Sequence, residues 1–388
     1  MFRKNHHLDK SPKISSQEAH SIKGTGPIIH QKTLEGEVSI KNSEETKLRK
    51  RPIPTEEIIN SKVPGRRLQL FKDSWKDDKW SYSVVSKGLG WKWEQRPPRC
   101  KLFCQTITPS ILAYQEKLLQ ANVIRPIKSI KFQGRLFQVR KRTSNEMRTI
   151  LDLSDLNTHI RCPKFRMNST QDIRNCLSKG MYTSSIDIQD AFWNIPIHPH
   201  FSRYLGFILN RKKFVFQALP NGLNLGPRVF TKLMAVIIRS LRLKNVNVIA
   251  YLDDLLIYEN SPSLCTKNTS LVLQELEKRG FLVNYTKSRL KPSQNFEHLG
   301  ILWNTNSGTL SIPSRHRKST LKSVKNIIKR RKVTLKEFQW MLVKTNFTTI
   351  VDPPSKCRAK NWYVHLKKLR KNQRTSLPHS LLQSLKGG

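Results

Sequence analysis

Three aspartates lie where apolar, strand-like segments of this sequence end. Asp187 falls in SSIDI, and Asp253 and Asp254 follow VNVIAYL. A carboxylate in such a place is costly to bury unless it is paired or binds a cation. Carboxylates from adjacent strands can hold two divalent ions about 4 Å apart, which suits in-line displacement at phosphorus. Mg²⁺ needs few protein ligands because phosphates and waters complete its shell. The sequence therefore predicts a phosphoryl-transfer site with two Mg²⁺ ions, for which Mn²⁺ is an alternative.

The charge of the chain points to a polyanionic partner. Its 388 residues contain 71 Lys and Arg against 27 Asp and Glu, a formal net charge of +44. Such an excess repels itself in a compact protein unless a polyanion neutralises it. A hydrophobic fraction of 37%, with 8 Trp and 16 Phe, is enough for packed cores and excludes a purely disordered basic tail. Nucleic acid is therefore the expected partner.

The sequence gives no sign of a membrane or of secretion. No apolar run approaches the roughly 18–20 residues that span a bilayer, and the N-terminus has no apolar core of a signal peptide. Six scattered cysteines are typical of a reduced, intracellular protein, in the nucleus or the cytoplasm. Cys100 and Cys104 have the spacing of half a zinc site, but free thiols are favoured because no second Cys/His pair is near.

The elements around the aspartates predict an α+β fold. Thr108-Pro109 starts a helix with an apolar face made by Ile111, Leu112, Leu118, Leu119 and Val123. A strand pair follows, RLFQVRK and MRTILDL, joined by a polar turn. SSIDI, a helix over PRVFTKLMAVIIRSLR, VNVIAYLDDLLIY and a helix ending at Gly280 then follow the split β-α-β plan. That plan places the ends of the central strands, and so the acids, side by side.

Several segments resemble the motifs of reverse transcriptases, in family order from Ile111 to about Trp303. YLDD resembles their catalytic hairpin, although Tyr-x-Asp-Asp alone occurs by chance in about one chain in twenty of this length. IDIQDAFWNIPI resembles their first acidic motif and LPNGLNLGP their Leu-Pro-x-Gly-Leu motif. GRLFQVRKRTSNEMRTILDLSDLN resembles the fingers hairpin, and FLVNYTKSRLKPSQNFEHLGILW the segment that leads to the primer grip. The resemblance implies a right-hand polymerase with fingers, a ferredoxin-like palm and a helical thumb.

The resemblance also assigns roles to residues. It implies that Asp187 and Asp253 bind metal, with the Ile188 carbonyl as a further ligand and Asp254 as a less tightly bound second acid. The fingers cations that grip the triphosphate correspond to Lys141 and Arg148, and Lys287 corresponds to a lysine near the leaving pyrophosphate. Cations there would neutralise charge on the phosphate oxygens, the main electrostatic task of phosphoryl transfer.

Three further positions bear on the substrate. Phe192 matches an aromatic residue that obstructs a ribose 2′-hydroxyl, so the resemblance implies deoxynucleotides. RNA-dependent RNA polymerases are disfavoured by Phe192 and by Tyr251, where that class usually has glycine. Gly222 lacks a Cβ and lets the backbone approach the nucleotide. Asn221 departs from the Phe or Gln common in the motif, and Ser154 from a retroviral arginine on the template side.

The resemblance and the composition together predict five regions. We expect a disordered basic arm (1–62), a Trp-rich leader (63–107), fingers and palm (108–308), a helical thumb or connection (309–366) and a basic, frayed tail (367–388). In the arm, KLRKRP is either a nuclear-import address or a phosphate-binding arm. In the leader, Trp75, Trp80, Trp91 and Trp93 either stack on bases or, as we favour, staple a small packed lobe.

In the thumb region the sequence predicts two helices. Leu321, Val324, Ile327 and Ile328 form one apolar stripe. Thr334 and Glu337 have the spacing of a capping box before a second helix, from Leu335 to Val343.

The leader, the PRVFTKLM run and the IIKRRKVTLKEFQ segment most resemble the polymerases of DIRS-like (tyrosine-recombinase) retrotransposons. In that family an RNase H domain follows, and we expect this chain to lack it. The predicted activity is RNA-directed DNA polymerisation, with an RNA template, a DNA primer and dNTPs as partners. The alternative is a catalytically silent, retrotransposon-derived nucleic-acid-binding protein, which the charge fits equally well.

Overall fold

The computed structural model describes residues 62–388, except 141–146, 349, 352–365, 367–373 and 378–388. The chain divides into two units, Met1–Ile53 and Pro54–Gly388, and every described residue belongs to the second. The expected basic arm, with its KLRKRP cluster, therefore lies outside the described residues except for Lys62. Most of the expected basic tail does so too.

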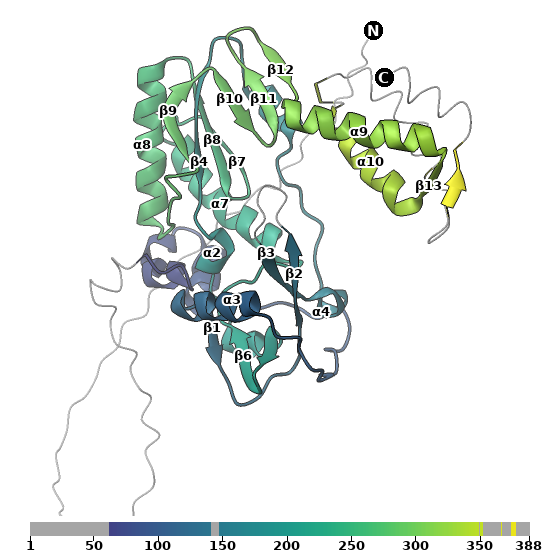
Figure 1. Ribbon diagram of the computed structural model, residues 1–388. Coiled ribbons are helices and arrows are strands. Elements are labelled where there is room, and N and C mark those ends of the chain that lie inside the picture. The colour runs from purple at the N-terminus through teal and green to yellow at the C-terminus, as the bar shows by residue number, and fades with distance from the viewer. Residues whose placement is uncertain (1–61, 141–146, 349, 352–365, 367–373, 378–388) are drawn as a thin grey trace, which may run out of the picture. The chain divides into compact units, whose positions relative to one another are not determined.

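A four-stranded antiparallel sheet forms the palm (Figure 1). Its strand order is β7-β8-β4-β9, and the connections from β4 to β7 and from β8 to β9 pass through the two longest palm helices. This is the predicted split β-α-β plan. The bounds are β4 (Tyr182–Asp187), α7 (Gly226–Arg242), β7 (Val248–Tyr251), β8 (Asp254–Glu259), α8 (Pro262–Lys278) and β9 (Arg289–Ser293).

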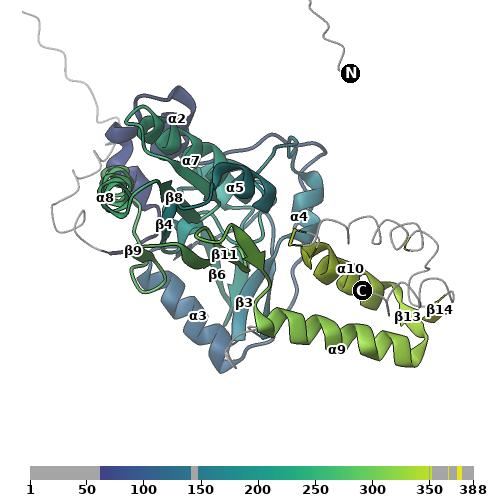
Figure 2. The same ribbon diagram turned by 90° about the horizontal axis from the view of Figure 1, so that it is seen from above.

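The two faces of the palm sheet belong to different cores. α8 packs on β4, β8 and β9, and α7 on β7; Figure 2 shows α8 end-on beside the strands. Leu255 and Ile257 of β8 join the core that contains these helices. Leu256, between them, packs with Ile173 and Trp303 on the other face. Side chains alternate between the two faces of a strand, so both faces of β8 are buried, as its continuous apolar run requires.

The second face of the palm sheet is covered by a short helix and a small sheet. α5 (Thr170–Cys176) contributes Ile173 and starts at a capping box made by Ser169 and Asp172. The sheet is an antiparallel meander of β10 (Asn295–His298), β11 (Ile301–Asn304) and β12 (Thr309–Ser311). β12 lies in the region expected to be helical from Gly308 onward; three residues are too short to show a strand period in the sequence.

The fingers contain the predicted hairpin and a second small sheet. α3 (Pro109–Gln120) starts at Thr108, whose hydroxyl accepts a hydrogen bond from the Ile111 amide, as expected. Leu119, expected on its apolar face, is 37% exposed, because the buried stripe at this end of the helix follows Leu118. The hairpin pairs β2 (Arg135–Arg140) with β3 (Met147–Asp152), and the second sheet has the order β1 (Ile124–Pro126), β6 (Lys212–Phe216), β5 (Gly206–Leu209). The remaining short helices between α3 and α7 are α4 (Ser154–His159), η2 (Ala191–Asn194) and α6 (Pro199–Ser202).

The Trp-rich leader is a packed lobe, as favoured from the sequence. It contains η1 (Arg67–Trp75) and α2 (Lys79–Lys87). Trp75 is fully buried, and its indole N–H donates to the Arg279 carbonyl of the palm at 3.1 Å. Trp91 is also buried and contacts Phe201 at a ring distance of 4.5 Å. These two indoles therefore serve the core rather than an open stacking surface.

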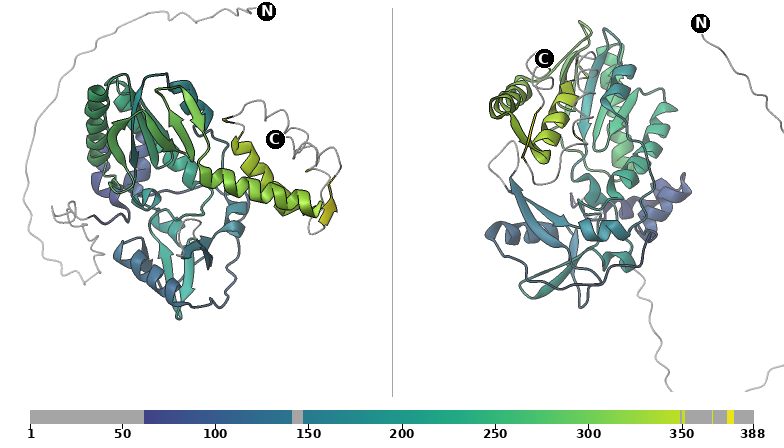
Figure 3. Two further views of the ribbon diagram at one scale, coloured as in Figure 1. Left: turned by 45° about the horizontal axis from the view of Figure 1, so that its top comes forward. Right: turned by 90° about the vertical axis from the view of Figure 1, so that its right-hand side faces the viewer.

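After the palm the chain forms the helices expected of a thumb. α9 (Ser314–Arg330) and α10 (Leu335–Thr348) pack on each other (Figure 3). Thr334 and Glu337 make the predicted capping box, with hydrogen bonds of 2.9 and 3.2 Å between each side chain and the other's backbone N–H. Leu321 of the expected apolar stripe is 50% exposed, whereas Ile327 is buried. Two short strands, β13 (Lys332–Thr334) and β14 (Arg374–Ser376), pair beside these helices.

Candidate active site

Strand register brings the three aspartates together at one end of the palm sheet. Asp187 ends β4 and pairs directly with Asp254, the first residue of β8. Asp253 occupies the two-residue turn between β7 and β8, and its carbonyl accepts a hydrogen bond from the Ile188 amide at 3.0 Å. The other turn residue, Leu252, has a φ of +53°, which is strained for a leucine. The hairpin thus presents its acids beside the end of β4.

These carboxylates lie in a setting that disfavours their charge. Burial, together with the charges of Asp253 and Asp187, raises the pKa of Asp254 to about 6. Burial also raises the pKa of Asp187; Lys287 opposes that rise and Asp253 adds to it. Like charges held close together in partial burial make such shifts typical of functional sites. A bound cation would relieve the repulsion, so the electrostatics fit a metal site.

The donor set fits Mg²⁺ rather than a closed metal cage. Among the described residues, no three His, Cys, Asp or Glu side chains are gathered as a ready-made metal site. Mg²⁺ does not need one, because it is held by one or two carboxylates together with substrate phosphates and waters. Asp187 and Asp253, which both line the cavity described below, can supply those carboxylates. Cys100 and Cys104 are free, exposed cysteines.

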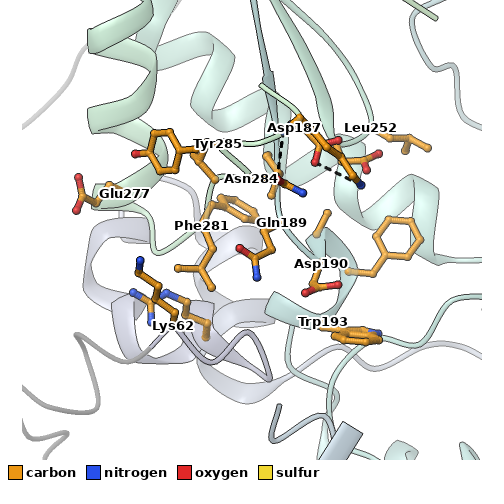
Figure 4. Close-up of a pocket in the computed structure, with 18 of the residues that line it drawn as sticks. Lys62, Asp187, Gln189, Asp190, Trp193, Leu252, Glu277, Phe281, Asn284 and Tyr285 are labelled. Atoms are coloured by element: carbon orange, nitrogen blue, oxygen red, sulfur yellow. Dashed lines mark hydrogen bonds and ion pairs between the residues drawn. The ribbon is translucent and has the colours of Figure 1, made fainter. Parts of the chain in front are cut away.

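A cavity of about 1150 Å³ opens in front of Asp187 and Asp253 (Figure 4). The segment after β4, the hairpin turn, the loop after α8, the leader and α3 all contribute to its wall. In Figure 4 Asp187 and Leu252 lie at one side, and Lys62 and Glu277 lie across the cavity, beyond Phe281 and Gln189. Its volume is sufficient for a nucleotide-sized ligand.

The loop after α8 is fastened to Asp187. The Asp187 amide donates to the Ser288 hydroxyl at 3.0 Å, and that hydroxyl donates to the Asn284 carbonyl at 2.7 Å. The Asn284 amide in turn donates to the Asp187 carbonyl at 2.8 Å. This double attachment holds Lys287, whose Nζ lies 4.0 Å from the Asp187 carboxylate. The structure therefore places Lys287 beside Asp187, and its assignment to the leaving pyrophosphate stays a prediction. Asn284 and Ser288, which the sequence did not single out, support this arrangement.

Phe192 lines the cavity and is held from behind. Its ring lies 5.7 Å from that of Phe230 in α7. Gly226, at the start of α7, leaves room for the ring, because a Cβ there would come within 3.1 Å of it. The preceding loop is fixed by the fully buried Asn194, whose side-chain amide donates to the carbonyls of Gln189 and Asp190 at 3.1 Å. Asn194 is a positioning residue that the sequence pattern did not reveal.

Asn221 and Gly222 lie in the loop before α7, and Asn221 lines the cavity. Gly222 has a φ of +105°, and a Cβ there would come within 2.9 Å of the Leu151 carbonyl oxygen. Asn157 of α4 fastens this loop, because its side chain donates to the Gly222 carbonyl at 2.8 Å and accepts from the Asn224 amide at 2.9 Å. Gly222 is thus required by its own backbone and by a close approach to the fingers.

Two predicted site residues are not placed. Lys141 lies outside the described residues, as does the turn between the hairpin strands. Arg148 belongs to β3, where it pairs with Val139, but its side chain is outside what the structure describes. Their assignment as triphosphate-binding cations stays a prediction.

Comparison with known proteins agrees with this arrangement. Residues 110–302 match the sequence family described as "Reverse transcriptase (RNA-dependent DNA polymerase)". The chain is 27% identical over 178 residues to "Protein P" of Duck hepatitis B virus (isolate white Shanghai duck S31), covering 44% of this chain and 22% of that protein. It is 25% identical over 274 residues to the "Gag-Pol polyprotein" of Gibbon ape leukemia virus, covering 64% and 15% respectively. The chain thus spans less than a quarter of the length of either relative.

Solved structures share the fold. The foamy viral protease–reverse transcriptase in complex with double-stranded DNA matches with a TM-score of 0.58 at 20% identity, over 82% of this chain and 70% of that one. A related foamy viral structure, described as dRH, matches with a TM-score of 0.59 over 82% and 59%. The fold is that of a right-hand polymerase, with fingers, a ferredoxin-like palm and helices after it. Together with the motif-bearing strands, the family match identifies residues 110–302 as a reverse transcriptase domain.

Proposed function

We propose that this chain is an RNA-directed DNA polymerase that adds dNTPs to the 3′-hydroxyl of a DNA primer on an RNA template. The observation that carries this proposal is the meeting of Asp187, Asp253 and Asp254 beside a cavity that also contains Lys287 and Phe192. The carboxylates suit phosphoryl transfer, and an aromatic wall beside them suits selection of the sugar of an incoming nucleotide.

The proposed roles are those that the resemblance implies, and the geometry supports them. Asp187 and Asp253 would hold Mg²⁺, with the Ile188 carbonyl as a further ligand and Asp254 as a supporting charge. When bound, the metal ions activate the primer hydroxyl and neutralise charge on the phosphates. Lys287, fixed near Asp187, is suited to the leaving pyrophosphate. Phe192, backed by Phe230, would exclude a ribose 2′-hydroxyl and so select dNTPs.

The thumb helix α9 supports a nucleic-acid partner. Its exposed cations include Arg317, Lys318, Lys322, Lys325 and Lys329. Rows of Lys and Arg bind phosphates through release of counterions, which makes binding depend on salt. The foamy viral protease–reverse transcriptase has been solved in complex with double-stranded DNA and with an RNA/DNA hybrid. We propose the same class of partner here.

The finer family assignment is also a proposal. The leader sequence resembles that of DIRS-like retrotransposon polymerases, and its docking on the palm is consistent with a fixed part of such an enzyme. An origin in such an element would account for the large positive charge of a protein that handles long nucleic acids.

The test is incorporation of dNTPs by the purified chain on an RNA template with a DNA primer, in Mg²⁺ and in Mn²⁺. The Asp253→Asn variant should lose incorporation while retaining template binding. Asp155→Asn, an exposed acid in the first turn of α4, is the matched control and should retain activity. If the unaltered chain incorporates nothing but binds template with a steep salt dependence, the silent nucleic-acid-binding alternative replaces this proposal.

A further inference from the structure

The leader, which precedes the reverse transcriptase domain at residue 110, forms part of the wall of the active-site cavity. Arg67 and Phe71 of the leader line it, together with Lys62 just before the leader and Lys117 of α3. None of these residues belongs to a motif that the resemblance links to the site. We propose that Lys62, Arg67 and Lys117 form a polyphosphate-binding face, which binds the triphosphate of the incoming nucleotide or the pyrophosphate that leaves it. The proposal deepens the proposed function and rests on it.

The leader is fixed firmly enough to present these charges. Its backbone is hydrogen-bonded to the fingers, Gly65 to the Ala121 carbonyl at 2.9 Å and Arg66 to the Trp193 carbonyl at 2.8 Å. Trp193 is the residue after Phe192, so this attachment reaches the wall against which the sugar would lie. A lobe tied at this point does not swing away from the cavity without breaking buried backbone hydrogen bonds.

A second attachment joins the leader to the palm. Arg279, 3% exposed at its side chain, makes hydrogen bonds of 3.0 and 2.7 Å to the Asp77 carboxylate and one of 3.1 Å to Glu275. Phe71 packs over Gly280, where a Cβ would come within 2.4 Å of its ring. The glycine, at a φ of +88°, both ends α8 and admits the leader. The wall that carries Arg67 is therefore part of the folded enzyme.

Aromatic rings support two of the three cations. The Arg67 guanidinium lies 5.1 Å from the ring centre of Phe71, and Lys117 Nζ lies 5.6 Å from that of Trp193. Such contacts orient a cation over the face of the ring. Arg67 is 8% exposed and interacts electrostatically with Glu277, whereas Lys62 and Lys117 are exposed.

The charge balance of the cavity favours an anionic ligand once metal is bound. Four cations line it, Lys62, Arg67, Lys117 and Lys287, against the four acids Asp187, Asp190, Asp253 and Glu277. Divalent ions at Asp187 and Asp253 would more than neutralise those two carboxylates, so the cations would be in excess. A cavity with an excess of positive charge attracts negatively charged ligands. The polyphosphate of a nucleotide is negatively charged and takes part in every cycle of the proposed reaction.

The experiment measures binding separately from catalysis, on the full chain in Mg²⁺. Isothermal titration with inorganic tripolyphosphate and with pyrophosphate is done on the unaltered chain and on Lys62→Gln/Lys117→Gln. We expect the double variant to bind tripolyphosphate about tenfold or more weakly, since two charges are lost. Lys72→Gln is the control, because Lys72 is an exposed lysine of η1 that does not line the cavity, and this variant should bind as the unaltered chain does. Arg67 is left unchanged because its buried side chain also packs the leader.

Steady-state incorporation then shows which polyphosphate the face serves. A raised KM for dNTP with little change in kcat in the double variant assigns it to the incoming triphosphate. Weaker product inhibition by pyrophosphate with an unchanged KM assigns it to the leaving group. Tripolyphosphate binding equal to that of the unaltered chain overturns the inference even if the enzyme is active. Conversely, charge-dependent binding by a chain that incorporates nothing would retain this face and remove the polymerase proposal.

Discussion

Replacing Asp254 by asparagine should stabilise the metal-free protein, although it alters the candidate active site. Asp254 is half-buried, and burial together with Asp253 and Asp187 raises its pKa from 3.8 to about 6. At neutral pH the folded protein must keep this carboxylate charged in an unfavourable place, whereas the unfolded chain does not. Asparagine has nearly the same shape without the charge. The unfolding free energy should therefore rise.

The magnitude and the pH window follow from linkage. A rise from 3.8 to about 6 corresponds to roughly 3 kcal/mol of destabilisation above pH 6, and partial solvent screening reduces this to about 2 kcal/mol. Below pH 3.8 the group is protonated in both states, and the destabilisation vanishes. It grows as the pH rises from 3.8 to 6 and is complete above that. At pH 5 about half of it, roughly 1 kcal/mol, should be present.

Denaturant or thermal unfolding of Asp254→Asn and of the unaltered chain, in EDTA at pH 8 and pH 5, measures this effect. We expect the variant to be more stable at both values, with the larger difference at pH 8. Mg²⁺ should raise the stability of the unaltered chain more than that of the variant, because the cation relieves the same repulsion. Glu116→Gln, an exposed acid of α3, is the control and should show no such pH-dependent gain. A variant less stable than the unaltered chain at pH 8, or a difference that does not change with pH, would refute the electrostatic reasoning.

Three further substitutions test the site and its supports. Phe192→Ala should bring the kcat/KM for ribonucleotides close to that for deoxynucleotides, because the ring that lines the cavity is lost; parallel incorporation assays measure the ratio, and unchanged discrimination would exclude Phe192 as the sugar filter. Gly222→Ala should lower both stability, by about 1–3 kcal/mol, and activity, since φ is +105° and a Cβ would meet a backbone oxygen at 2.9 Å. Gly180→Ala, with a φ of +88° but nothing within 4 Å of its Cβ, is the matched control and should lose stability without comparable loss of activity. Asp77→Ala should destabilise the protein by about 2–4 kcal/mol in urea unfolding, because the nearly buried Arg279 loses a bidentate partner while Glu275 stays; a change below about 0.5 kcal/mol would show that the leader is not fastened through this pair.

The sequence predicted those parts of the fold whose cause is local. The Thr334–Glu337 capping box and the proline start of α3 depend on residues three or four positions apart, so their spacing is visible in the chain. The palm was predictable because two helices of ordinary length separate short apolar runs, and few topologies accept that order. The acids were found because a charged group at the end of a buried strand conflicts with its surroundings.

Contacts between distant segments account for what the sequence left open. Asn157 holds the Gly222 loop across 65 residues, and its place at the end of the fingers-hairpin motif does not reveal this contact. Asn194 looks like one polar residue in an apolar motif, yet it is fully buried and fixes the loop after β4. Helical periodicity likewise cannot tell which end of a face is covered, which is why Leu119 and Leu321 were expected to be buried and are not.

At the domain boundary too, contacts between distant segments decide what the sequence alone does not show, and the leader is the example. The family match begins at residue 110, but Trp75 is fully buried and hydrogen-bonded to the residue before Gly280, and Phe71 fills the space that this glycine leaves. Without the leader, the Arg279 side chain would lose its Asp77 partner and the Trp75 ring beside it, and the cavity would lose one wall. The positive φ of Gly280 is enough to explain a glycine at a helix end, and the Glu275 carboxylate is enough to explain a buried Arg279. Neither residue taken alone therefore indicates a contact with the leader. Their convergence on one lobe indicates that the reverse transcriptase domain of this chain is completed by residues that precede it.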